Sequence, residues 1–397
     1  MFTETKQSFV LRTARRSTAE AQIDLSQSRQ WFANEVAYGF IGQEHLFAER
    51  IINVPVETVQ TAVMLSLEMH NREINALMDG LVERTSEYQI NYQLAAAGEL
   101  QPLDEDGNPR PTQPKGTYTV AFPIRGGGDA YGTNRVSRAK ATVADMNRWT
   151  WNMLTRDARW IRRFILSAIF TNAAYTYVDK EHGSITVQPL ALTSDGVTYV
   201  RNTGTAATDE HFYAQAAAIS NSADPFPTWY TELNEHPNNM GPYVAYVPTN
   251  QVSAVKTLAD FHPADDANLI MGADVTRAAI AANVDSPVSD SPFNRFGNKY
   301  LGYHDAGVHV VQWDSLPDNY GFVEARGADP VLGMREYPEA ELQGFFPEFF
   351  DMDGNHMGVR FIRFAGFGVM NRVGALAYRI GNSTYSAPPT GYDARAI

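Results

Sequence analysis

The strongest constraint on the fold is a long amphipathic helix, which the sequence predicts over residues 142–170. Apolar side chains recur there at three- and four-residue spacing and form a broad stripe, while arginines occupy the opposite face. Thr142 and Asp145 have the spacing of a capping box, with aspartate in place of the usual glutamate. At ~1.5 Å per residue such a helix is roughly 40 Å long, which exceeds the average for globular domains. We therefore expect it to be the principal helix of the fold.

A long β-hairpin is predicted just before this helix. Aromatic and β-branched residues alternate with polar ones over residues 88–94 and 118–122, which indicates two strands. Residues 95–116 between them are rich in proline and acidic side chains, as in a loop. Such a two-stranded ribbon is only marginally stable alone, so we expect it to pack on another part of the molecule. Its acidic tip contains Asp104, Glu105 and Asp106.

The remaining segments complete an α+β fold. A second amphipathic helix is expected over residues 57–82, after a polar N-terminal arm. Strand, helix and strand patterns follow one another between residues 242 and 323, which indicates a small α/β lobe. Smaller elements are expected as a strand pair over 184–200 with its turn around 193–196, short helices over 209–220 and 225–236, and strands at 360–364 and 375–379.

Composition narrows the class of protein. A chain of 397 residues is too long for one ordinary core and suggests two or three lobes. The 44% hydrophobic and 12% aromatic content excludes a disordered chain, and no apolar run approaches the ~18 residues of a membrane span. The first residues lack the profile of a signal peptide. Cysteine is absent, which excludes disulfides, thiolate catalysis and cysteine-bound metals and fits a cytosolic origin.

Charge is unevenly distributed along the chain, whose formal net charge is −13. Residues 135–163 hold eight basic and two acidic side chains, whereas residues 51–134 hold five basic and eleven acidic ones. This asymmetry suits regions that meet their opposites on neighbouring subunits, and it equally suits two solvated faces. The arginines of residues 148–163 leave two roles open: contact with nucleic acid, or a solvated or subunit-facing helix side. A further basic patch in the arm consists of Arg12, Arg15 and Arg16.

No motif in the sequence specifies catalysis, a cofactor or a metal. The nine histidines include no pair with the four-residue spacing of a helical zinc site, and His304 and His309 are the closest pair. Residues 351–355 resemble the start of a calcium-binding loop, but histidine and isoleucine replace its glycine and final glutamate, so an acidic turn between strands is expected. Gly126–Gly128 miss the spacing of a dinucleotide-binding loop, and we interpret them as a flexible hinge after the ribbon.

The order of these elements resembles that of the HK97-type major capsid proteins of tailed bacteriophages. The likeness covers most of residues 84–386, and each motif is weak alone. In that family the hairpin is the E-loop, the long helix is the spine of the peripheral (P) domain, and the α/β lobe is the axial (A) domain. The stretches that carry the likeness are 141–174, 242–251, 299–302, 307–311, 316–320, 342–344 and 360–375.

The resemblance implies a division of the chain into successive regions. The long helix at 142–170 is then the spine of a P domain that the A domain interrupts. The implied regions are an N-terminal arm with a helix (1–83), the E-loop hairpin and its return (84–140), the first part of the P domain (141–240), the A domain (241–325), the closing P-domain strands (326–386) and a C-terminal tail (387–397).

The resemblance also implies a structural protein that is not an enzyme. Such a subunit assembles with itself into the hexamers and pentamers of an icosahedral shell around double-stranded phage DNA. Its expected location is the virion, after assembly in the host cytoplasm. The expected partners are a scaffolding protein, a portal, a decoration protein and the packaged DNA through weak, non-specific contact, with no membrane. Neither Lys115 nor Asn371 matches a cross-linking motif, so a non-covalent shell is expected, and no N-terminal scaffolding domain is evident, which suggests a separate scaffold.

Candidate contact residues follow from the same resemblance. In this family the hairpin lies across a neighbouring subunit, so opposite charges are expected to meet there. The inter-subunit candidates are Arg135, Arg138 and Lys140, opposite Asp104, Glu105 and Asp106. The candidate DNA-facing patch is Arg12, Arg15 and Arg16. No catalytic residue, cofactor or metal ligand is predicted.

Two alternatives stay open. The same fold forms encapsulins, bacterial compartments that hold enzymes, although the extended hairpin and the long arm favour a virion. A cytosolic enzyme with an unrecognised carboxylate site is the alternative from a different class, because acidic residues are common enough for two of them to meet in space.

Overall fold

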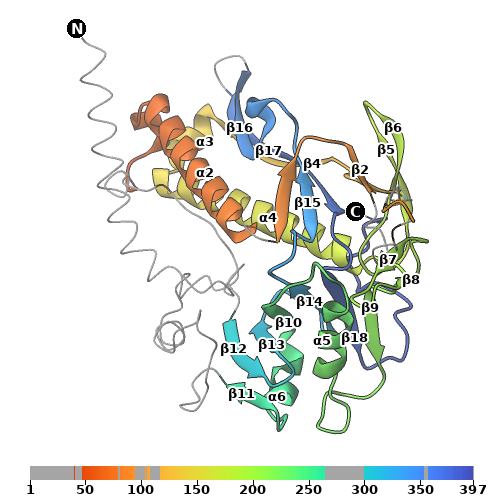
Figure 1. Cartoon of the computed structure of the whole chain (residues 1–397). Coiled ribbons are helices and arrows are strands. Elements are labelled where there is room, and N and C mark those ends of the chain that lie inside the picture. The colour runs from red at the N-terminus through yellow and green to blue at the C-terminus, as the bar shows by residue number, and fades with distance from the viewer. Residues whose placement is uncertain are drawn as a thin grey trace.

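The computed structural model describes residues 40, 47–78, 81–93, 103, 105–107, 117–263, 299–352 and 356–396. Within these ranges the chain has an α+β fold with a five-stranded sheet, a seven-stranded sheet and three two-stranded ribbons. Figure 1 shows the long helices α2 (Val56–Met78) and α4 (Val143–Phe170) beside the first sheet, with the second sheet below them. The predicted basic patch at Arg12, Arg15 and Arg16 lies outside the described residues.

The predicted principal helix is confirmed as α4. Its N-cap is Thr142, whose hydroxyl accepts a hydrogen bond from the Asp145 N–H at 3.3 Å. The Asp145 carboxylate accepts in turn from the Thr142 N–H at 2.9 Å, so the predicted capping box is formed with aspartate. These bonds satisfy backbone donors that have no partner within the helix. At the other end of α4, every residue from 164 to 170 is buried.

The second predicted helix is confirmed as α2, which ends at Met78, before the expected end at residue 82. The chain then enters β1 (Val82–Thr85), which pairs in parallel with β15 (Leu332–Arg335). Val82 therefore contributes to the core from a strand, although its spacing also continues the apolar stripe of the helix. Periodicity alone does not separate these two possibilities for a short apolar stretch.

The five-stranded sheet contains β1, β15, β16 (Phe345–Met352), β17 (His356–Val369) and β4 (Arg125–Asn134). β16 and β17 form an antiparallel hairpin in which Met352 pairs with His356. The acidic turn predicted near residues 351–355 therefore connects two strands as expected, although residues 353–355 lie outside the described ranges. β4 pairs along the other edge of β17, and α4 packs on both strands.

The hinge expected at Gly126–Gly128 is wrong, because these residues lie inside β4, in register with β17. A Cβ atom at Gly127 would lie 2.8 Å from Cε2 of Trp160 on α4. One at Gly126 would lie 2.8 Å from Cε1 of Phe364 on β17. The strand therefore needs glycine where aromatic rings lie against its backbone, which is one of the usual reasons for glycine within a strand.

The seven-stranded sheet forms a lobe with α5 (Phe226–Asn234), the one-turn helix η3 (Thr249–Gln251) and the short α6 (Val252–Val255). Its strands, in spatial order, are β11 (Phe261–Pro263), β12 (Lys299–His304), β13 (Val308–Gln312), β10 (Tyr243–Val247), β14 (Tyr320–Ala325), β18 (Ala375–Ile380) and β9 (Phe212–Gln215). β10, β13 and β14 confirm strands of the predicted α/β lobe, and α5 confirms the second of the two short helices.

Two strands of this sheet differ from the expectations. Residues 375–379 are expected among the closing strands of the P domain, whereas β18 lies between β14 and β9 in the seven-stranded sheet. All residues of β18 except Arg379 are buried, which suits an interior strand with a neighbour on each edge. β9 is the neighbour along one edge of β18. It is a strand within residues 209–220, so the helix predicted there is wrong.

The strand pair expected around residues 193–196 is also absent from the described chain. Two other hairpins form instead, β5 (Tyr175–Asp179) with β6 (Gly183–Val187), and β7 (Thr198–Val200) with β8 (Ala206–Thr208). Asp195 lies in the loop between the two hairpins, where its carboxylate accepts from the Val197 N–H at 2.8 Å. This side chain therefore stabilises a loop at the position where a turn between strands is predicted.

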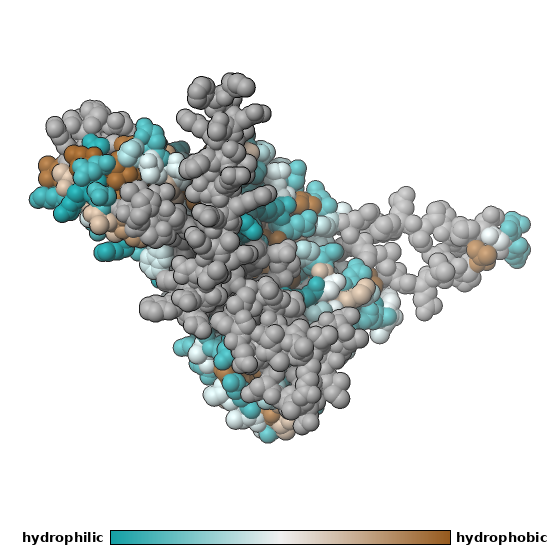
Figure 2. All heavy atoms as spheres, turned by 90° about the vertical axis from the view of Figure 1, so that its left-hand side faces the viewer, coloured by the Kyte–Doolittle hydropathy of each residue, from teal (hydrophilic) through white to brown (hydrophobic). Residues whose placement is uncertain are grey.

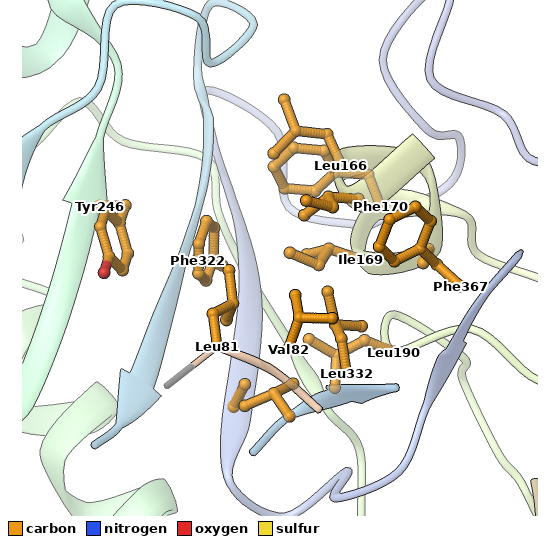
Figure 3. Close-up of a cluster of buried hydrophobic side chains, with 14 of the residues drawn as sticks. Leu81, Val82, Leu166, Ile169, Phe170, Leu190, Tyr246, Phe322, Leu332 and Phe367 are labelled. Carbon is orange, nitrogen blue, oxygen red and sulfur yellow. The ribbon is translucent and has the colours of Figure 1, made fainter. Parts of the chain in front are cut away.

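One hydrophobic core is shared by the two sheets. Leu166, Ile169 and Phe170, at the end of α4, have no exposed surface. In Figure 3 they lie between residues of the five-stranded sheet on one side and Tyr246 and Phe322 of the seven-stranded sheet on the other. Full burial of such a side chain contributes roughly 1.5–3 kcal/mol, so this junction is a major source of stability.

We expect Gly127→Val to destabilise the chain by about 1–3 kcal/mol, because its side chain would overlap the Trp160 ring and push α4 away from β4. The control is Ala130→Val on the exposed side of the same strand, which should change the unfolding free energy by less than about 0.5 kcal/mol. Urea denaturation of the unassembled chain, followed by tryptophan fluorescence, measures both. Equal stability of the two variants would contradict the close packing.

Candidate assembly surfaces

The predicted hairpin is confirmed as a ribbon of β2 (Gln89–Gln93) and β3 (Thr117–Ala121). The strands are antiparallel, and Tyr92 pairs with Tyr118 across them. The two rings stack with their centroids 5.2 Å apart. Aromatic cross-strand pairs of this kind stabilise a two-stranded ribbon that has no sheet behind it.

The base of the ribbon packs on the β5–β6 hairpin, as the small apolar content of the ribbon predicts. Ala121 forms a small buried cluster with Ile185 and Val187 of β6. Tyr88, just before β2, stacks on His182 in the β5–β6 turn at a centroid distance of 3.9 Å. These contacts fix the base of the ribbon on the body of the molecule.

The described part of the hairpin tip is exposed. Leu103 is 61% exposed, and Glu105 and Asp106 are also exposed. This short piece, residues 103 and 105–107, lies away from the body of the molecule in Figure 2. Asp104 lies outside the described residues. The tip thus presents an apolar side chain next to acidic ones, a combination suited to contact with another molecule.

The basic candidates lie on α3 (Arg135–Lys140), a short helix between β4 and α4. Asn134 caps it, because its side chain accepts from the Ser137 N–H at 2.8 Å while Ser137 Oγ accepts from the Asn134 N–H at 2.9 Å. Lys140 is exposed and Arg138 is half-buried, whereas only the backbone of Arg135 is described. Of the two candidates whose side chains are described, Lys140 is therefore the more accessible to a partner.

An apolar groove of about 300 Å³ lies beside α3. Its walls come from α2, α4 and the β4–β17–β16 strands, and Arg138 lies at its side. Nearby apolar side chains remain exposed, with Ile52 and Met64 both 51% accessible. The apolar residues that line the groove itself are mainly Ile51, Val54, Val56, Val59, Val63, Tyr131, Met146, Phe349 and Val359. An apolar groove with a basic border is thus part of the same surface as the basic candidates.

Several charges of the basic segment are used within the chain. Arg156 forms an ion pair with Asp129 on β4. Arg162 donates to the Ser315 hydroxyl at 2.8 Å, and Arg163 donates from Nε to the Gly391 carbonyl at 2.9 Å. The charge asymmetry read from the sequence therefore includes contacts inside one subunit.

A buried ionic network that no sequence pattern indicates joins α2, α4 and β17. Arg363 donates to both oxygens of Asp157, from Nε at 2.7 Å and from Nη2 at 2.8 Å. His70 Nε2 lies 2.8 Å from Asp157 Oδ2, and Asn71 accepts from Arg363 at 2.9 Å. Burial alone raises the pKa of Asp157, but Arg363 and His70 outweigh it and hold that pKa below its usual range.

Carboxylates near this network do not have the properties of a catalytic pair. Asp129 and Asp157 line a cavity of about 130 Å³ together with Trp160. Each carboxylate is already paired with an arginine, Asp129 with Arg156 and Asp157 with Arg363. A general acid needs a raised pKa, whereas the pKa of Asp157 is lowered.

Two groups of described residues have spacing compatible with a metal ion. In the first, Asp209, Glu235 and His236 surround the guanidinium of Arg201, whose Nη2 lies 3.1 Å from Asp209 Oδ1 and 3.2 Å from Glu235 Oε1. His236 Nε2 lies 3.0 Å from Asp209 Oδ2. Arginine thus already supplies the positive charge that a metal would bring.

The second group contains His304, Asp224 and Asp260. The Ala306 N–H donates to His304 Nδ1 at 3.2 Å, so the proton of the neutral ring is on Nε2. Nε2, which carries the proton, lies 3.1 Å from Asp224 Oδ2. In this tautomer the lone pair of Nδ1 already accepts from the backbone, and Nε2 has none to offer a metal.

His309, the histidine nearest to His304 in the sequence, has a different partner. Its Nδ1 lies 3.0 Å from the hydroxyl of Tyr300. Burial, with the positive charge of Arg326 as a second cause, lowers the pKa of His309 to about 4.

None of the helices in the described parts of the chain combines the length and the hydropathy that a membrane span requires.

No protein-family model matches this chain, and neither does any curated protein. Among solved structures, a chain from Mycobacterium phage Patience is 17% identical over 89% of this chain and 95% of that one, with a TM-score of 0.61. The asymmetric unit of bacteriophage PhiM1 mature capsid is 9% identical over 77% and 87%, with a TM-score of 0.46. The capsid structure of the Cyanophage P-SCSP1u is 11% identical over 76% and 87%, with a TM-score of 0.43.

The likeness to the Patience chain extends over nearly the whole of both chains and defines the fold. The chain has the HK97-type α+β fold that the order of its predicted elements indicates. The ribbon β2–β3, the long helix α4 and the seven-stranded sheet are the parts that this order predicts.

The buried His309 makes the folded state sensitive to acid. The unfolded chain takes up a proton at this residue below its ordinary pKa of about 6.5, while the folded chain resists protonation down to about 4. The unfolding free energy should therefore fall by about 2 kcal/mol between pH 7 and pH 5 on account of this residue.

Urea denaturation at both pH values, in wild type and in His309→Gln, measures this contribution. The variant should show a shallower fall, whereas the control Tyr300→Phe, which removes the hydrogen bond and keeps the imidazole, should keep the wild-type slope. The same pH dependence in His309→Gln as in wild type would refute the assignment.

Proposed function

We propose that this chain is the major capsid protein of a tailed bacteriophage, which assembles with itself into an icosahedral shell around double-stranded DNA. The observation that carries the proposal is the HK97-type fold over nearly the whole chain. The role is structural, and the engaged carboxylates and the histidine tautomers described above give no support for an enzymatic one.

Surfaces outside the cores support assembly. The ribbon β2–β3 carries Leu103 and two acidic side chains into solvent, and an apolar groove lies open beside α3. A single subunit therefore exposes apolar and charged groups that a neighbouring copy would cover. In closed shells, such contacts repeat by symmetry in hexamers and pentamers.

We assign the regions of the chain accordingly. Residues 84–140 form the E-loop and its return, residues 141–240 and 326–386 form the P domain, and residues 241–325 form the A domain. The exceptions within the P-domain ranges are β9 and β18, which pair in the seven-stranded sheet and which we therefore assign to the A domain. The arm comprises residues 1–83 and the tail residues 387–397.

The proposed partners follow from a shell of this kind. They are a separate scaffolding protein, a portal, a decoration protein and the packaged DNA, in a virion assembled in the host cytoplasm. The contacts between subunits are non-covalent in this proposal. In support, Asn371 is engaged within its own chain, where it donates to the Asp329 carbonyl at 3.1 Å and accepts from the Gly374 N–H at 3.2 Å.

Electron microscopy of the full chain, expressed with its scaffold, tests the function. We expect closed shells with clustered A domains at the local symmetry axes, filled with DNA when a packaging system is present. Small shells that enclose protein would favour an encapsulin-type compartment instead. A chain that stays a soluble monomer under these conditions would contradict both shell functions.

Contacts between the ribbon tip and a neighbour's α3 are the most specific part of the proposal. The tip carries Glu105 and Asp106, and α3, whose Arg138 lines the groove, ends with the exposed Lys140. Leu103 would enter or border the apolar groove while the acidic side chains face the basic border. Each exposed ion pair contributes only about 0–1 kcal/mol, but many copies in a closed lattice add together.

Lys140→Glu should lower shell yield several-fold, most strongly at low salt, because it places like charges opposite each other where screening is weak. The swap Lys140→Glu with Asp106→Lys should recover most of the yield. Arg138 is left unchanged because it is half-buried at the groove, and Arg135 because only its backbone is described.

The matched control is Lys256→Glu, an equal charge change at an exposed position after α6 in the other lobe. Shell yield against ionic strength, measured by sedimentation, compares the four proteins. If Lys140→Glu follows the control, or if the swap fails to recover yield, the tip and α3 do not meet.

A further inference from the structure

The exposed face of α4 has an unusual composition. Of the 28 residues of this helix, the exposed ones are Arg148, Asn152, Arg156, Arg159 and Arg163. Solvent-facing helix surfaces usually mix both signs of charge. Here the helix presents arginine at every exposed position but one, in a chain whose net charge is −13.

These residues form a single line along the helix, named here the arginine stripe. Their successive spacings of four, four, three and four residues keep them on one side of a helix with 3.6 residues per turn. The line from Arg148 to Arg163 extends over roughly 22 Å at ~1.5 Å per residue. The opposite side of α4 is packed on the sheet, so the stripe is held by a rigid element.

The two carboxylates of α4 have hydrogen-bond partners outside the stripe. Asp145 is used at the N-terminus of α4, where it caps the helix with Thr142. Asp157 is buried and bound to Arg363 on the sheet side. Asp129 of β4 pairs with Arg156, which remains 64% exposed in its side chain.

Existing contacts also orient part of the stripe. The Nε of Arg163 donates to the Gly391 carbonyl at 2.9 Å. This bond uses one of the five N–H donors of the guanidinium. Arginine presents several donors in a fixed fork that matches phosphate oxygens, and it does so better than lysine.

The chemistry of the stripe distinguishes it from the surface around α3. The groove beside α3 is apolar, as the centre of a protein interface usually is. The stripe exposes only guanidinium groups and one amide, with no exposed apolar residue on α4 among them. A line of cations without an apolar centre fits a polyanion better than the surface of a folded protein.

We propose that the arginine stripe of α4 contacts the phosphate backbone of double-stranded DNA without regard to sequence. The inference deepens the proposed function and rests on it, because the DNA in question is the packaged one and the stripe would face the interior of the shell. Each contact is weak, and the high local DNA concentration inside a filled shell keeps such sites occupied. The test below also distinguishes this role from contact between the stripe and a neighbouring subunit.

The test compares three forms of the full chain purified before shell assembly. They are wild type, the stripe variant Arg148→Gln/Arg156→Gln/Arg159→Gln, and the control Lys180→Gln/Lys256→Gln/Lys299→Gln, which removes the same charge from exposed positions on other elements. Fluorescence anisotropy with a short random-sequence duplex measures binding over a range of salt concentrations. Each form is also assembled with scaffold and counted by electron microscopy.

We expect the stripe variant to bind DNA about tenfold or more weakly than the control at low salt. The slope of log Kd against log salt concentration should be lower by about 3 in the stripe variant, which is close to one unit for each arginine that no longer binds a phosphate. Shell yield should be unchanged. A wild-type chain that does not bind the duplex, or a stripe variant that binds like the control, would overturn the inference.

The assembly measurement separates this inference from the proposed function. If the stripe variant binds DNA like the control but fails to form shells, the arginines contact a neighbouring subunit and the inference is wrong while the shell function stands. If no form assembles yet wild type still binds DNA through the stripe, the proposed shell function fails and the phosphate contact stands.

Discussion

The structure depends on the burial of the last two turns of α4 between two β-sheets. Leu166, Ile169 and Phe170 have no exposed surface, and they contact the five-stranded sheet on one side and the seven-stranded sheet on the other. In Figure 3, Leu332 and Phe367 represent the first sheet. Because this core belongs to both sheets, separating them would expose all of these side chains at once. The end of α4 therefore fixes the position of each sheet relative to the helix.

Buried ion pairs complete this arrangement at points where apolar packing alone would not determine the geometry. Asp157 with Arg363 joins α4 to β17, and Asp179 with Arg335 joins β5 to β15. Arg335 also donates to the carbonyl of Phe122, at the end of the ribbon strand β3. A buried pair contributes little net stability, but removing one partner leaves an uncompensated charge, so the paired geometry is strongly preferred. The ribbon base and the arginine stripe are thus held by elements that cannot shift independently.

How far the sequence predicts this fold depends on whether the signal is local. The start of α4 is predicted to within one residue, because Thr142 and Asp145 form a cap that three-residue spacing reveals. The strand β4 is missed, since Gly126–Gly128 have no side chains that alternate and the reason for them is Trp160 and Phe364, distant in sequence. The line of exposed arginines follows from helical period, whereas the use of Asp157 by Arg363, 206 residues away, does not. Sheet membership of β18 is likewise a long-range property that no local pattern contains.

The position of β18 has a consequence for the order in which the subunit can fold during synthesis. β18 is the strand that joins β9 to the rest of the seven-stranded sheet, yet more than a hundred and fifty residues separate β9 from it in the chain. A nascent chain that has not yet reached residue 375 can form β10 with its helices, but β9 and the exposed edge of β14 must wait for their shared neighbour. Such an edge invites pairing with other chains. Ribosome pausing or premature termination before this point would yield species with an open sheet edge, which the finished chain does not have at β14.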